Sequence, residues 1–180
     1  MFLYAGWQTQ AHQGREMLTQ DESLLIQQIE KAFAGITLGD GISLNMTEYL
    51  DSGGCASHFA ELAKQDERDD WRKLSEEILE RFTVTFSFTD LQGFRFYLAP
   101  YMLWAIRNHR TSDSIICDFT IYALDPSSYQ FTETKFTEWF TPVQQAAILA
   151  FLDYATNVET MDSAVACKHA DSIRSLLMNP

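Results

Sequence analysis

Carboxylates gather most densely at Asp66, Glu67, Asp69 and Asp70. Oxygen ligands at this density could bind a hard divalent cation, and a negative cluster could also attract a basic protein. The alternative is a helix N-terminus, where carboxylates stabilise the positive end of the helix dipole. Because basic residues interrupt the cluster and dilute its field, the helix interpretation is favoured, and no metal site is predicted.

A second group that could bind a ligand consists of Asp40, Asp90 and Arg95. Asp40 lies between Gly39 and Gly41, and glycines allow backbone amides to approach a ligand closely. No Lys-Ser or Lys-Thr follows these glycines, so the phosphate-binding loop motif is absent. Tight turns, and a structural ion pair between Asp90 and Arg95, are the alternatives to a pocket.

Cysteine and histidine are too sparse for a recognisable site. Cys55 and His58 lie three positions apart, and Cys167 and His169 lie two apart. Either pair offers a nucleophile and a base, but one pair falls short of a four-ligand zinc site and nothing in the sequence orients it. Serine-nucleophile and kinase motifs do not occur. The sequence therefore predicts no catalytic residue and no cofactor, and it favours a non-enzymatic protein without deciding the question.

Charge and composition narrow the class of partner. The 180 residues include 25 acidic and 13 basic side chains, for a net charge of −12. Phosphate backbones and anionic membranes repel such a chain, so neither nucleic acid nor a membrane is an expected partner, whereas a basic protein is. Three cysteines without a CxxC pair, and an N-terminus without a basic signal region, predict a cytoplasmic protein. No apolar run approaches the ~20 residues of a membrane-spanning helix.

The pattern of apolar residues predicts the elements that position these side chains. Residues 1–19 are expected to be loosely ordered, and residues 20–180 to form a single domain. Apolar residues at helical spacing predict helices over 21–34, 46–50, 66–82, 142–155 and 162–177. At the start of the fourth of these, Thr141 and Gln144 have the spacing of a capping box.

Two further stretches predict β-structure. Residues 82–89 alternate apolar and hydroxyl side chains, which is the period of a half-buried strand. After a turn, residues 94–98 are expected to pair back and complete a hairpin over about 82–98, with Pro100 then beginning a helix. Another strand is predicted over about 114–124. The predicted fold class is therefore α+β, with a small antiparallel β-sheet packed by flanking helices.

Three stretches of the chain together resemble a family of uncharacterised bacterial proteins, a domain of unknown function. They are GITLGDGISL at 35–44, DERDDW at 66–71 and DLQGFRFYLAPYM at 90–102. The resemblance covers roughly residues 20–155. Family members usually carry Leu-Pro-Ala-Tyr where this chain has Leu-Ala-Pro-Tyr at 98–101. The resemblance implies a bacterial cytoplasmic protein, and it supplies no activity, cofactor or catalytic residue.

These observations lead to three hypotheses about function. The first is a non-enzymatic, immunity- or adaptor-like domain that binds a basic protein through the acidic surface at residues 66–70. The second is an enzyme or small-ligand-binding domain with a pocket near Asp40, Asp90 and Arg95. The third is a structural homodimer, formed through aromatic residues of the stretch 97–104 at the surface.

Overall fold

Helices and turns make up the regular structure of the computed structural model, which describes residues 17–131 and 135–178. The longer helices are α1 (Gln20–Ala32), α2 (Leu44–Asp51), α5 (Leu91–Asn108), α6 (Ile116–Ala123), α8 (Pro142–Thr156) and α9 (Ser163–Met178). The shorter helices are α3 (Phe59–Leu62), α4 (Glu76–Arg81) and α7 (Phe136–Trp139). Single 3-10 turns are η1 (Ala56–His58), η2 (Ala63–Gln65), η3 (Trp71–Lys73), η4 (Thr85–Ser87) and η5 (Tyr129–Phe131).

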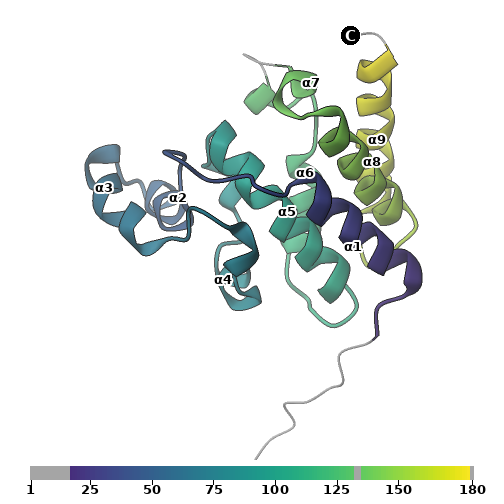
Figure 1. The fold of residues 1–180 in the computed structure, drawn as a ribbon, viewed down its shortest axis with the longest axis horizontal. Helices are drawn as coiled ribbons and strands as arrows, with labels where there is room; N and C mark the ends of the chain where they lie inside the picture. The colour runs from purple at the N-terminus through teal and green to yellow at the C-terminus, as the bar shows by residue number, and fades with distance from the viewer. Residues whose placement is uncertain (1–16, 132–134, 179–180) are drawn as a thin grey trace, which may run out of the picture.

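The helix α5 lies at the centre of the molecule. In Figure 1 it has α1, α8 and α9 on one side and α2, α3 and α4 on the other. α8 packs against both α9 and α1, while α5 contacts α1 and α6. Phe94 and every residue from Phe96 to Ile106 are buried. A helix that is apolar on all sides is stable only inside a protein, which explains the central position of α5.

Aromatic rings join α5 to the segment before α8. The ring of Phe94 meets those of Phe86, Phe131, Trp139 and Phe140 in tilted or edge-on contacts, with centroids 4.8–6.2 Å apart. Each such pair contributes about 0.5–1.5 kcal/mol beyond the burial of its surface. These rings belong to one cluster of buried side chains that extends from α1 to α9.

The predicted α+β fold is wrong, because the described residues contain no strand. The stretch 82–89, predicted as the first strand of a hairpin, forms a turn followed by η4 and buries Thr85 beside Phe86. The expected turn and second strand are the start of α5. The Asp90 carboxylate accepts a hydrogen bond from the Gly93 amide (2.9 Å), and this caps the helix where a hairpin turn was predicted.

The predicted strand over 114–124 is also wrong, since residues 116–123 form α6. Ile115, just before the helix, is 48% exposed. The buried residues are instead Ile116, Cys117, Thr120 and Ile121, whose spacing follows one face of a helix.

Two predicted helix boundaries differ as well. Pro100 lies inside α5, where it was expected to begin a helix. Its missing N–H leaves the Phe96 carbonyl without the usual helical donor. The predicted helix over 66–82 is divided into η3 and α4, because Leu74 has an extended backbone (ψ 123°) and Ser75 caps α4.

The remaining predicted helices are confirmed as α1, α2, α8 and α9. The capping box of α8 is present, with the Gln144 amide donating to Thr141 Oγ1 (3.4 Å) and the Thr141 amide donating to Gln144 Oε1 (3.0 Å). Of the N-terminal segment expected to be loosely ordered, residues 1–16 lie outside the described residues, and Thr19 caps α1. Within the described ranges, no helix is long and apolar enough to cross a membrane.

Candidate functional site

Hydrogen bonds bring the glycine-containing loop 35–44 against two other parts of the chain. The Leu38 amide donates to the Arg68 carbonyl (2.7 Å), and the Arg68 guanidinium donates to the Gly39 carbonyl from Nε (3.0 Å) and Nη2 (2.6 Å). At the start of α5, Asp90 Oδ1 accepts from the Ile42 amide (3.0 Å). The stretches 35–44, 66–71 and 90–102, far apart in sequence, thus meet at one junction, which we call the motif junction.

The motif junction is packed too closely for a side chain at Gly93. A Cβ atom there would lie 1.9 Å from Thr89 Oγ1 and 2.6 Å from the Ile42 carbonyl oxygen. Gly39 has a positive φ of 53°, which favours glycine. Gly93 therefore permits close packing at the start of α5, whereas Gly39 permits the turn in the loop.

Three of the four clustered carboxylates stabilise the backbone around them. Asp66 accepts hydrogen bonds from the Asn45 amide (3.1 Å) and side chain (2.9 Å) at the start of α2. Glu67 accepts from the backbone amides of Asp69 (2.9 Å) and Asp70 (3.0 Å), which lower its carboxyl pKa. Asp70 caps η3, and its pKa is lowered by the hydrogen bond from the Arg72 side chain (2.7 Å).

Asp69 is the exposed member of this cluster. The cluster is therefore not a free negative patch. It does not form the predicted N-terminus of a helix over 66–82 either, since Asp70 caps only the 3-10 turn η3 and the other two bind the backbone of α2 and of residues 69–70. Among the described residues, no group of three or more His, Cys, Asp or Glu side chains could hold a metal ion.

The second predicted group is only partly brought together. Asp90 accepts from the Gly93 and Ile42 amides, so it holds the loop that contains Asp40. Asp40 itself is exposed, and Arg95 is half-buried, with its Nε buried and without a partner among the residues described. A pocket near these three residues stays a hypothesis. To bind a ligand there, the Asp90 carboxylate would have to release the Gly93 and Ile42 amides.

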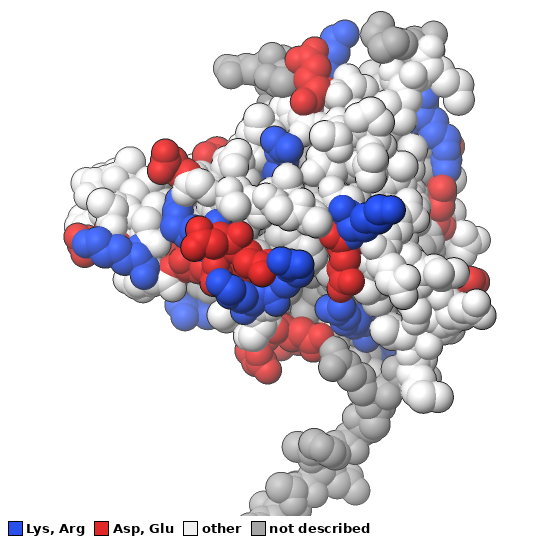
Figure 2. Space-filling view, in the orientation of Figure 1, with Lys and Arg blue, Asp and Glu red and all other residues white. Residues whose placement is uncertain are grey.

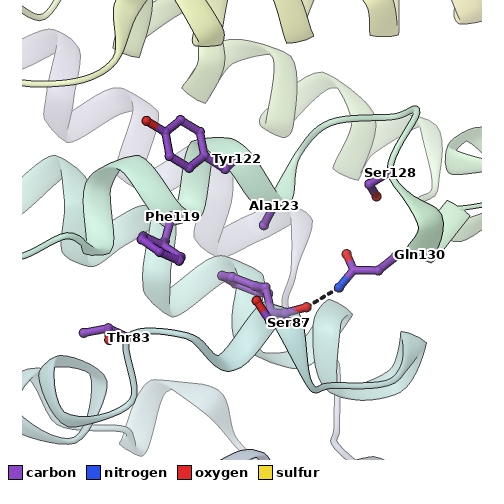
Figure 3. Close-up of a pocket in the computed structure, with 8 residues that line it drawn as sticks. Thr83, Ser87, Phe119, Tyr122, Ala123, Ser128 and Gln130 are labelled. Atoms are coloured by element: carbon purple, nitrogen blue, oxygen red, sulfur yellow. Dashed lines mark hydrogen bonds between the residues drawn. The ribbon is translucent and has the colours of Figure 1, made fainter. Parts of the chain in front are cut away.

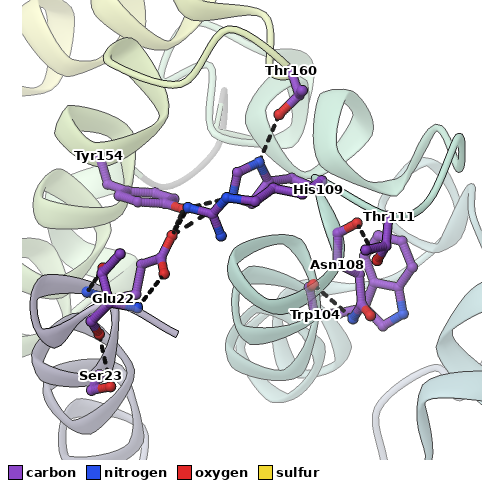
Figure 4. A network of polar contacts seen from close by, with 10 residues as sticks. Glu22, Ser23, Trp104, Asn108, His109, Thr111, Tyr154 and Thr160 are labelled. Carbon is purple, nitrogen blue, oxygen red and sulfur yellow. Dashed lines mark hydrogen bonds and ion pairs between the residues drawn. The ribbon is translucent and has the colours of Figure 1, made fainter. Parts of the chain in front are cut away.

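A buried polar network, which sequence reasoning missed, ties α1 to α5 and α8 (Figure 4). Glu22 of α1 is 1% exposed and accepts hydrogen bonds from Arg110 Nη2 (2.5 Å) and the Tyr154 hydroxyl (2.6 Å). The same hydroxyl lies 2.9 Å from His109 Nε2, and His109 Nδ1 lies 2.6 Å from Thr160 Oγ1. Burial raises the pKa of Glu22, but the hydrogen bonds from Arg110, Tyr154 and Thr19 outweigh it and lower the pKa to about 2.

The network holds helices together and leaves no free base. Glu22 is ionised at neutral pH, with both oxygens engaged, since the Thr19 amide donates to Oε2 (2.8 Å). Burial and the Glu22 charge raise the pKa of Tyr154, which keeps its hydroxyl a donor. The one signal for this network in the sequence was the spacing of Thr19 and Glu22, which is that of a capping box.

The Cys55 and His58 pair is assembled around a hydroxyl. Ser57 Oγ lies 3.1 Å from Cys55 Sγ and 3.1 Å from His58 Nδ1, and the Tyr49 hydroxyl lies 2.8 Å from the same nitrogen. The hydrogen bond from Ser57 lowers the pKa of the Cys55 thiol, whereas burial raises that of Cys117 to about 12. Cys55 is exposed, so this arrangement predicts a more reactive thiol at the surface.

An open hollow of about 180 Å³ lies between η4 and α6 (Figure 3). Phe86, Phe119 and Tyr122 line it, and the Gln130 side chain donates a hydrogen bond to the Phe86 carbonyl at its edge. Its lining residues are apolar, hydroxyl or amide side chains, without an ionised group. The hollow can accommodate an apolar shape, but its walls offer no acid, base or nucleophile with a lowered pKa.

The model of a family of unknown function, DUF6714, matches residues 20–173. The chain belongs to this family. The match begins at the first residue of α1 and ends within α9, so it includes the motif junction and the Glu22 network. The expected membership of an uncharacterised family is confirmed, while the match does not single out the three motif stretches. No curated protein and no solved structure is detectably similar to the chain.

Proposed function

We propose that this chain is a non-enzymatic, immunity- or adaptor-like protein that binds a basic partner protein through carboxylates of α2 and α4. The observation that supports it is a group of exposed carboxylates around the ion pair linking the two helices. Arg81 Nη2 of α4 lies 2.9 Å from Glu48 Oε2 of α2. Asp51 follows Glu48 by one turn of α2, and Glu77 precedes Arg81 by one turn of α4. Asp51 and Glu77 therefore lie on the helix faces that meet at this ion pair, and both side chains are exposed.

Helix stability explains the position of Glu77, which lies in the first turn of α4, but not the positions of Asp51 and Glu80. Asp51 ends α2, and the exposed Glu80 lies in the last turn of α4. A negative charge near a helix C-terminus is unfavourable by about 0.3–1 kcal/mol, because it faces the negative end of the dipole. Residues that oppose local stability are often retained for function.

This surface, the α2–α4 carboxylates Asp51, Glu77 and Glu80, replaces residues 66–70 as the expected contact region. Figure 2 shows charged side chains of both signs crowded over the α2 to α4 side of the view, with most of the surface over α8 and α9 uncharged. The net charge of −12 would speed encounter with a cationic partner, and local pairing would set the orientation.

Affinity capture from the lysate of the native host, at low and at moderate salt, tests whether such a partner exists. We expect a stoichiometric basic protein whose recovery falls as salt rises, because screening weakens exposed charge pairs. Recovery of chaperones alone would count against the proposal.

Two triple variants with the same change in net charge then locate the contact. The first is Asp51→Asn, Glu77→Gln, Glu80→Gln, and the control neutralises the exposed carboxylates of Asp113, Glu138 and Glu159. Exposed ion pairs contribute about 0.2–1 kcal/mol each, so the first variant should weaken binding of the captured partner about tenfold. Equal weakening by both variants would mean that overall charge, and not this surface, attracts the partner.

A homodimer is the second candidate, and the surface that favours it differs from the predicted one. Residues 97–104 lie in the core, since every one of them is buried. Leu24 of α1 and Val143 of α8 are instead 55% and 59% exposed on two helices that pack together. A monomer by sedimentation at high protein concentration would argue against this candidate.

A further inference from the structure

A hollow of about 120 Å³ lies where α1, η3, α4 and α5 meet. Trp71, Leu79, Leu103 and Trp104 are among the apolar residues that line it, and all four are buried. Four charged side chains line it as well, the carboxylates of Glu30 and Glu76 and the guanidinium groups of Arg72 and Arg107. The hollow therefore combines aromatic and aliphatic walls with a few polar groups, which is the usual composition of a small-ligand site.

One wall of this hollow carries a buried donor without an acceptor. Trp104 is 1% exposed, and its Nε1 is buried with no hydrogen-bond partner among the residues described. Trp71, on the same hollow, differs because its Nε1 donates to the Phe33 carbonyl (2.9 Å). Figure 4 shows the Trp104 indole projecting away from the Glu22 and Tyr154 side chains, so that network does not supply the acceptor. Burying a donor without a partner is unfavourable, and a ligand that supplies the acceptor would remove this cost.

A second donor lies one turn along the same face of α5. Arg107 follows Trp104 by three positions, and residues at this spacing are neighbours on a helix surface. Arg107 Nη2 is 3.6 Å from Glu30 Oε1, which is longer than a hydrogen bond, so the guanidinium keeps N–H groups to donate. The Arg107 side chain is 30% exposed, so it lies at the edge of the hollow and its movement is restricted.

We infer that this hollow binds a small carboxylic acid with an apolar body. The carboxylate would accept hydrogen bonds from the Trp104 indole and the Arg107 guanidinium, and the body would lie among Trp71, Leu79 and Leu103. The two donors on α5 suit an anion, and charged acceptors form the stronger hydrogen bonds. The Arg72 and Arg107 guanidinium groups balance the charges of Glu30 and Glu76, which line the same hollow. None of the α2–α4 carboxylates lines this hollow, so the inference does not depend on the proposed capture of a basic protein.

Three probes of nearly equal shape test the ligand class on the purified full chain. Benzoate offers a charged acceptor, benzamide a neutral acceptor and benzylamine a cationic donor. Titrations followed by the indole N–H resonances in ¹H–¹⁵N spectra should show benzoate shifting the Trp104 signal, with at least tenfold weaker binding of the other two. Equal affinity for benzamide, tighter binding of benzylamine, or no shift of the Trp104 signal with benzoate would overturn the inference.

Matched variants identify the donors. Trp104→Phe keeps an aromatic ring but removes the N–H, and we expect it to weaken benzoate binding about tenfold, or 1.4 kcal/mol. Trp139→Phe is the control, because Trp139 Nε1 is also buried without a partner among the described residues but is not part of this hollow. The control should retain affinity within twofold.

Arg107→Gln, at the edge of the core, should also weaken binding about tenfold, and it covers the case in which Trp104→Phe does not fold. Unchanged affinity in Arg107→Gln would contradict the inference.

Discussion

Glu22→Gln is the substitution that most directly tests how the helices are held together. The carboxylate is 1% exposed and binds Arg110 (2.5 Å), Tyr154 (2.6 Å) and the Thr19 amide (2.8 Å). Glutamine has almost the same volume, but it is neutral and would turn an NH2 group toward these donors. Removing one partner of a buried ion pair costs about 3–5 kcal/mol. Because the Arg110 side chain is 34% exposed and can regain water, we expect the free energy of unfolding to fall by about 3 kcal/mol.

The effect of Glu22→Gln should depend on pH. Burial raises the pKa of Glu22, but its hydrogen bonds dominate and lower the pKa from 4.5 to about 2. A carboxyl whose folded-state pKa is lowered stabilises the protein above its unfolded pKa, and the contribution is lost as pH falls toward the folded value. At 1.36 kcal/mol per pKa unit the shift corresponds to about 3 kcal/mol, of which about 2 kcal/mol is lost between pH 7 and pH 3.

Urea unfolding followed by tryptophan fluorescence measures this difference. Wild type, Glu22→Gln and the exposed-site control Glu159→Gln are compared at pH 7 and pH 3. The gap between wild type and Glu22→Gln should shrink from about 3 to about 1 kcal/mol, since other carboxyls titrate equally in both proteins. The control should match wild type within about 0.5 kcal/mol. A gap that stays constant with pH would refute the linkage of Glu22 ionisation to folding.

Three further predictions concern the motif junction and the surface thiol. Gly93→Ala should destabilise by about 3 kcal/mol or more in thermal unfolding, because its Cβ would lie 2.6 Å from a backbone carbonyl oxygen. Asp90→Ala should cost about 2 kcal/mol in urea unfolding by removing a helix cap and a loop hydrogen bond, whereas Asp40→Ala at an exposed position should cost less than about 0.5 kcal/mol. Cys55 should be alkylated several-fold faster than Cys167 at pH 7, as peptide mapping after brief iodoacetamide treatment would show. Equal rates would mean that the hydrogen bond to its thiol does not activate it.

The helices that were predicted correctly carry their signals within a few residues. The Thr141 and Gln144 capping box and Pro142 specify the start of α8 locally, and α8 begins at Pro142. The predicted strand at 94–98 failed because alternation of apolar residues is not specific to a strand when a helix is buried on all sides. In α5, Phe94, Phe96 and Leu98 alternate with a half-buried Arg95, yet Tyr97 is buried too. Burial of both faces depends on packing by α1 and α6, which local sequence does not report.

The candidate sites show the same division between local and long-range signals. The roles of Glu67 and Asp70 are of the kind that sequence can indicate, because each carboxylate binds backbone amides two or three positions away. The role of Asp66 is not, because it binds Asn45, 21 positions away. The Glu22 network was not, because Arg110 and Tyr154 lie 88 and 132 positions away from Glu22. In the sequence, only the capping-box spacing of Thr19 and Glu22 indicates the network. A capping box does not indicate that the Glu22 carboxylate is buried.

The Trp104 indole, which has no acceptor among residues 17–131 and 135–178, could not have been predicted either, since whether a donor lacks an acceptor depends on every element packed around it. Asp66, Glu67, Asp70 and Asp90, which have the most evident chemistry in the sequence, all accept backbone amides in the fold. A group that already stabilises its own backbone must give up that bond to act on a ligand, and this raises the free energy of binding. A buried donor with no partner loses nothing when a ligand arrives. For this fold, a small-ligand site is therefore better sought at the polar groups left unpaired by folding than at the densest charge.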